Sequence, residues 1–143
     1  MDAVDRAGSH ADRIREFIRA QARLLAEHPH FPRLFVREMI DHQATHAEHA
    51  FTDTAAGAFE RLCGVIEDGQ KEGVFRRSLD ARFAAISIIA QLAYFVIARP
   101  AVGLLLGHGT GGPPPEVSEQ FFAHAEAFAL DALLVGGAEE PRP

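Results

Sequence analysis

The sequence lacks the features on which several classes of protein depend. It contains one cysteine, Cys63, in 143 residues. An internal disulfide is therefore impossible, and we expect a reducing, cytoplasmic setting. Lysine and arginine never occur more than two in a row, and the formal net charge is -6. Because proteins hold phosphate backbones with clustered cations, we expect no direct grip on DNA by this chain.

Long apolar runs are also missing. The longest, Phe83 to Ala98, is interrupted by Ser87 and Gln91 and is shorter than the roughly 20 residues that a membrane-spanning helix needs. The stretch after Met1 is polar, so we expect neither a signal peptide nor contact with a membrane. No segment alternates between apolar and polar residues as a half-buried strand would. The sequence therefore predicts an all-α protein.

Residues that start and stop helices divide the chain. Ser9 and Asp12 have the spacing of a helix cap, and His28-Pro29 should end the helix that they begin. Pro32 suits the first position of a second helix. We expect a third helix over residues 55–72, capped by Asp53 or Thr54. It should end at Gly73, with the following apolar residues, 74–75, folded back over its last turn.

The second half of the chain is divided in the same way. Asp80 should cap a helix that runs to Ala98, and Pro100 should end or kink it. One or two further turns then lead into a glycine- and proline-rich loop at 107–115, and a final helix covers residues 116–135. The prediction is a bundle of five main helices with one or two short ones, forming a domain over 9–135. Residues 1–8 are expected to be disordered and 136–143 to be a flexible tail.

Two of these helices carry more apolar surface than a single chain of this size easily covers. The helix at 83–98 is apolar on all sides, and the final helix has two apolar strips, although a surface helix usually has one. The simplest explanation is a homodimer in which these last two long helices meet their copies; the alternative is a central helix in a monomer. The candidate interface residues are Ile86, Ile89, Ala93, Ile97, Phe121, Ala125, Phe128 and Ala132.

Two motifs resemble a known family. The first is HPHFPRLFVREM, at residues 28–39, which is similar to the segment that joins the first two effector-domain helices of TetR-type transcriptional regulators. The second is IEDGQKEGVFRRSLDARFAAISIIAQLAYFVIARP, at residues 66–100, which is similar to the family's passage from its long helix into its first dimerisation helix. The order and spacing of these segments carry the resemblance.

The resemblance implies a TetR-like C-terminal domain, which senses a small hydrophobic effector and dimerises, within a transcriptional repressor. Family members carry a helix-turn-helix ahead of this domain. The chain opens almost directly at the linking helix, so we expect that DNA reader to be absent and DNA binding to belong to a parent protein. The sequence identifies neither the effector nor the operator.

A set of apolar residues with a few polar ones is the usual lining of a small-molecule site. The candidates for effector contact are Phe17, Phe35, Phe59, Leu62, Ile66, Gln91, Tyr94 and Phe95. Taken singly, each apolar member can equally be plain core, and Gln91 can bind a backbone group or its own copy across a dimer. Arg37-Glu38 is expected to form an ion pair between helices. Arg99 is expected to lie at a helix C-terminus, where the dipole favours a cation.

The histidines offer a competing hypothesis. His42, His46 and His49 lie at i, i+4 and i+7, and imidazoles at this spacing on one helix can share a divalent metal ion. The alternative is a polar face at a helix junction, with no cofactor. The sequence contains neither a serine motif nor a pair of carboxylates that would indicate an enzyme. A metal-binding helical protein and a dimerisation domain without a ligand thus remain the alternatives to an effector-binding domain.

Overall fold

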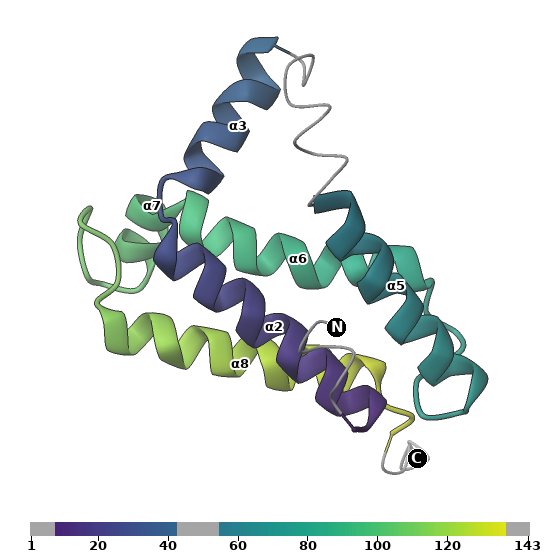
Figure 1. The fold of residues 1–143 in the computed structure, drawn as a ribbon. Coiled ribbons are helices and arrows are strands. Elements are labelled where there is room, and N and C mark those ends of the chain that lie inside the picture. The colour runs from purple at the N-terminus through teal and green to yellow at the C-terminus, as the bar shows by residue number, and fades with distance from the viewer. Residues whose placement is uncertain (1–7, 43–54, 137–143) are drawn as a thin grey trace.

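A computed structural model describes residues 8–42 and 55–136, and they form six helices (Figure 1). These are α2 (His10–Glu27), α3 (Phe31–His42), α5 (Ala56–Lys71), α6 (Ala81–Ile97), α7 (Arg99–Leu105) and α8 (Pro115–Leu133). Within the described ranges there is no strand, only an isolated antiparallel bridge between Phe75 and Leu134. The all-α prediction is confirmed, with five longer helices and one short one. The expected caps Asp53 and Thr54 lie outside the described residues.

Ser9 and Asp80, which were expected to cap helix N-termini, do so in the structure. The Ser9 hydroxyl accepts a hydrogen bond from the backbone N–H of Asp12, and the Asp12 carboxylate accepts one from the backbone N–H of Ser9. Asp80 caps α6 by accepting from the backbone N–H of Phe83 at 3.0 Å. These contacts satisfy N–H groups that the first turn of a helix leaves without partners.

The turn after α5 folds back as predicted. Gly73 has a φ of 76°, a left-handed conformation that glycine adopts without steric cost. The backbone N–H groups of Val74 and Phe75 then both donate to the carbonyl of Gly69. Phe75 is fully buried, and its ring occupies the space where a side chain at Gly69 would lie. This turn therefore closes one end of the core.

The helix break at Ala98 differs in part from the prediction. Helix α6 ends before Pro100, but Arg99 begins α7 and does not close α6. Its Nη2 donates to the carbonyl of Pro113 at 2.6 Å, and its side chain packs against Gly112. The dipole explanation for Arg99 was therefore wrong, because this side chain holds the 107–115 loop. No single described helix is long and apolar enough to cross a membrane; α6 and α7 reach that length only together, and they meet at 86°.

The core lies where α2, α5, α6 and α8 meet. In Figure 1, α2 lies alongside α8, α5 crosses the first half of α6, and α3 stands over the other end of α6. Each helix of the core contributes a buried stripe at helical spacing. The largest fully buried side chains are Phe75, Ile14, Ile18, Leu62, Ile66, Leu92 and Leu133, with Pro113 in the loop. Helix α3 packs on α6 and leaves several apolar side chains exposed.

Candidate functional site

A pocket of about 380 Å³ lies between α3 and the C-terminal end of α6. Helix α3 supplies most of its lining because its contributing residues recur every three or four positions and so share one side of the helix. Helix α6 contributes a single residue, Ile97. The lining residues are Arg33, Val36, Arg37, Ile40, Asp41 and Ile97. The volume falls in the lower part of the range of about 300–1,000 Å³ that is usual for small-molecule sites.

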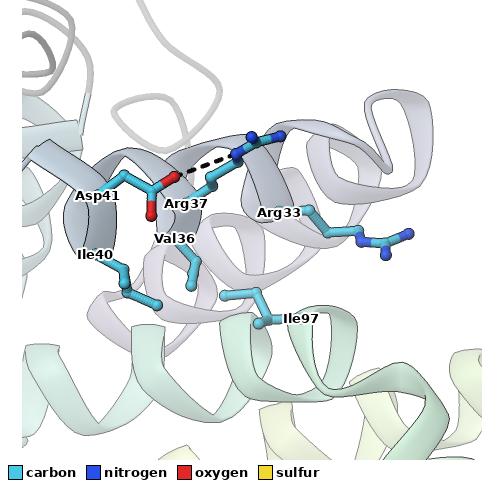
Figure 2. Close-up of a pocket in the computed structure, with 6 residues that line it drawn as sticks. All are labelled: Arg33, Val36, Arg37, Ile40, Asp41 and Ile97. Carbon is cyan, nitrogen blue, oxygen red and sulfur yellow. Dashed lines mark hydrogen bonds and ion pairs between the residues drawn. The ribbon is translucent and has the colours of Figure 1, made fainter.

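The pocket has an apolar floor and a charged rim. Val36 and Ile40 point from α3 toward Ile97 (Figure 2). Arg33 extends along the edge, and the Nε of Arg37 donates to Asp41 at 3.2 Å within α3. The arrangement can hold a small molecule that is apolar at one end and charged at the other.

The expected ion pair between helices at Arg37-Glu38 was wrong. Arg37 pairs with Asp41, one turn along the same helix. Glu38 is half-buried, and its Oε1 is shielded from solvent with no hydrogen-bond partner among the described residues. The i,i+4 spacing of Arg37 and Asp41 favours a pair on the surface of α3, where neither helix α6 nor the core is involved.

Three of the candidate effector residues lie in the closed core. Phe17, Leu62 and Ile66 are 3%, 0% and 0% exposed. Phe59 is half-buried beneath the guanidinium of Arg82, whose carbon is 4.9 Å from the ring centre. None of these four lines the pocket between α3 and α6. Their contact with an effector stays a prediction.

The remaining candidates lie on α3 and on the second half of α6. Phe35 is half-buried, Gln91 is half-buried, and Tyr94 is 57% exposed. Phe95 is buried and stacks on Phe121 of α8, with ring centres 4.0 Å apart and planes 6° apart. The motif search missed Arg33, Val36 and Ile40. The signal that could have found them is the pair of arginines at i,i+4 within the 28–39 motif, with aliphatic residues on the same side.

Helix α6 presents two separate stripes beside its buried face. One contains Ile86, Ala90, Ala93 and Ile97, at i, i+4, i+7 and i+11, and its last member lines the pocket under α3. The other contains Ser87, Gln91 and Tyr94. Gln91 lies one turn before Phe95, which packs on α8, so Gln91 is the member of this stripe nearest to the border with α8.

Helix α8 continues that border with a row of rings. Phe121 contacts His124, and His124 contacts Phe128, with ring centres 6.4 and 5.8 Å apart. Phe128 is 59% exposed, and Ala132 is exposed as well. Ala125, in contrast, is fully buried within the chain, and Ile89 packs partly buried against the same core. The exposed candidates for a dimer contact on α8 are thus Phe128 and Ala132.

Charged contacts fix the framework around these surfaces. Arg19 of α2 forms two hydrogen bonds, of 3.0 and 2.9 Å, with the Glu126 carboxylate of α8. This contact raises the pKa of Arg19 above its ordinary value. Arg82 and Glu60 join α6 to α5 in the same way. Burial raises the pKa of the Cys63 thiol, which keeps it protonated and unreactive.

The proposed metal ligands cannot be placed. His46 and His49 lie outside the described residues, and the side chain of His42 is also outside them. Residues 8–41 and 55–136 contain no group of three or more histidine, cysteine, aspartate or glutamate side chains that could hold a metal ion. The metal hypothesis stays a prediction.

A comparison with protein families gives a match over most of the chain. Residues 11–123, from α2 into α8, match the family described as "Tetracyclin repressor-like, C-terminal domain". The chain belongs to this family. The match includes both motifs that carry the resemblance to TetR-type regulators, and the TetR-like C-terminal domains are a family of transcription regulators and not of enzymes. Comparisons with curated proteins and with solved structures give no match.

Proposed function

We propose that this TetR-like domain senses a small effector and dimerises, and that it serves a transcriptional repressor. The observation that carries the proposal is the double use of α6. One stripe of this helix reaches the pocket under α3, and another borders the exposed rings of α8. A helix in this position can transmit a change on its effector side to a partner protomer on its other side.

The dimer half of the proposal rests on uncovered apolar surface. Tyr94 on α6 and Phe128 on α8 are each more than half exposed. Phe83 lies on the same outer part of α6 and is 71% exposed. Several large apolar side chains left exposed on two neighbouring helices support an interaction site here. We assign the partner contact to the border of α6 and α8, with Gln91 at its centre and Ile97 outside it.

The effector half rests on the pocket and on the linkage between sites. A ligand changes a conformational equilibrium only when it binds one state better than the other. In a regulator that carries a DNA-reading domain, binding at α3 and α6 would favour one arrangement of the two protomers and so change the affinity for DNA. Val36, Ile40 and Ile97 supply the apolar contact that a hydrophobic effector needs.

The dimer assignment is tested by matched charge substitutions. Phe128→Glu should convert the chain to a monomer in equilibrium sedimentation, because a carboxylate cannot be buried without a partner. Phe31→Glu is the control: Phe31 is 56% exposed but lies on α3, away from α8. A dimer that survives Phe128→Glu and dissociates with Phe31→Glu would place the interface on α3 instead.

The effector assignment is tested by thermal-shift screening with a panel of small hydrophobic compounds. A ligand that binds only the folded state raises the melting temperature, and the rise grows with the ratio of ligand concentration to Kd. At least one compound should raise it in the unmodified protein and fail to do so in Ile97→Ala. If no compound raises the melting temperature, the domain dimerises without sensing a ligand.

A further inference from the structure

We infer that the pocket between α3 and α6 selects an amphipathic anion, a carboxylate with a short unbranched aliphatic tail. This inference rests on the proposed effector-binding function and names the chemical class of the effector. It narrows the class of effector from any small hydrophobic molecule to an anion, because a neutral or cationic compound of the same size would bind less well.

The apolar floor of the pocket binds the aliphatic tail of the ligand. Val36 and Ile40 point toward Ile97 across the groove (Figure 2), and each exposes aliphatic carbon to it. Ile40 is 73% exposed and so leaves much apolar surface to cover. The hydrophobic effect favours each methylene that a ligand buries there. None of the described residues that line the pocket is aromatic, so a slender aliphatic chain fits this floor better than a ring that needs a stacking partner.

The charged rim of the pocket binds the carboxylate head group of the ligand. The lining contains two guanidinium groups and one carboxylate, a net charge of +1, in a chain whose formal net charge is -6. No hydrogen bond or ion pair joins Arg33 to another of the described residues. A guanidinium presents N–H donors in a planar fork that matches both oxygens of a carboxylate. Arg33 is therefore the first site for the ligand's carboxylate.

Arg37 is the second site. Its pair with Asp41 uses the Nε–H, and the pair is exposed, with 79% of the Arg37 side chain and 48% of the Asp41 side chain open to solvent. An exposed ion pair contributes little to stability. A ligand carboxylate can thus compete with Asp41 for Arg37 at small cost. Arg33 and Arg37 lie one turn apart on α3, so they can hold one carboxylate between them.

The test compares three ligands with the same tail: octanoate, 1-octanol and octylammonium. Each is titrated into the full chain by calorimetry near pH 7, where the carboxylate is ionised. Octanoate should bind about tenfold more tightly than 1-octanol, and octylammonium should bind least. Raising the salt concentration should weaken octanoate binding and leave 1-octanol unchanged, because salt screens only the charged contact.

Three variants locate the site. Arg33→Gln combined with Arg37→Gln should weaken octanoate binding about tenfold and change 1-octanol binding less than twofold. Lys71→Gln is the control for loss of positive charge elsewhere: it removes one cation, against two in the arginine variant, and lies at the exposed end of α5, at the other end of α6. Ile97→Ala should weaken both ligands. The melting temperature of each variant shows whether it is folded.

Each result decides the inference. If octanoate and 1-octanol bind equally, the inference is overturned while the effector-binding function stands. If octanoate binding falls with the arginine variants but not with Ile97→Ala, the anion binds at the surface of α3 and the inference is again overturned. If none of the three binds, the inference fails, and the wider screen of hydrophobic compounds then decides the proposed function by itself.

Discussion

At the scale of single residues, the closest contacts involve glycine. Gly69 lies in the last turn of α5, and the Phe75 ring packs directly over its Cα. Phe75 is fully buried, and the two backbone N–H groups that close the turn both donate to the Gly69 carbonyl. Gly64 lies in the same helix but has nothing within 4 Å of the position that a side chain would occupy. The two glycines therefore have opposite consequences for substitution.

Gly69→Ala should lower the free energy of unfolding by about 1–3 kcal/mol, because the added methyl group overpacks against the Phe75 ring. Gly64→Ala should raise it by up to about 1 kcal/mol, because alanine is the better helix former and meets no neighbour. Urea unfolding of the two variants beside the unmodified protein measures both values. Equal effects would show that Phe75 does not pack on Gly69.

The Ser9 hydroxyl donates to the Asp12 carboxylate and holds the pKa of that side chain below its ordinary value of 3.8. A lowered pKa means that the carboxylate stabilises the fold above about pH 3.8, and that this contribution is lost as the pH falls through the lower value of the folded state. Ser9→Ala should move the Asp12 pKa upward, as followed by an NMR titration. Ser118→Ala, far away on α8, should leave it in place; equal pKa values in all three proteins would contradict the capping box.

At the scale of the helix, the sequence predicted where helices begin and end better than which helices pack against each other. Ser9, Gly73 and Asp80 act through backbone groups a few residues away, so their roles can be read locally. The pocket cannot be read in this way, because Arg33, Val36 and Ile40 become a lining only when α3 packs over Ile97. Ile97 lines this pocket, and its place in a dimer interface stays a prediction, because spacing gives a stripe but not what the stripe faces.

The phenylalanines show the same limit. Phe17, Phe59 and Phe95 all lie at helical spacing on apolar faces, and the sequence gives no means of separating core from pocket among them. The structure places Phe17 in the core and Phe95 against Phe121. Arg99 was misread because its partner, the Pro113 carbonyl, lies across a loop. Partners that are distant in the sequence are what local patterns leave out.

The start of α6 gives a prediction at this scale. Asp80→Ala removes the side chain that accepts from the Phe83 N–H, and it should lower the free energy of unfolding by about 1 kcal/mol. Asp80→Ser keeps a capping oxygen and should lose only a small part of that amount. The comparison uses thermal or urea unfolding followed by circular dichroism. A loss with serine as large as that with alanine would mean that the carboxylate, and not the cap, stabilises α6.

At the scale of the whole molecule, α6 is the element that joins the two proposed activities. It packs on α5 and α8 through its buried face, reaches the pocket through Ile97, and leaves Tyr94 exposed. The family match runs from α2 through α6 and into α8. The account therefore predicts that the domain does not exist as a stable single chain.

The most direct test of this claim is the mass of the unmodified 143-residue protein in solution, measured by light scattering at micromolar concentration. The account predicts twice the mass of one chain. The mass of a single chain under these conditions would show that the exposed faces of α6 and α8 have no partner copy, and it would contradict the dimer on which the proposed regulation depends.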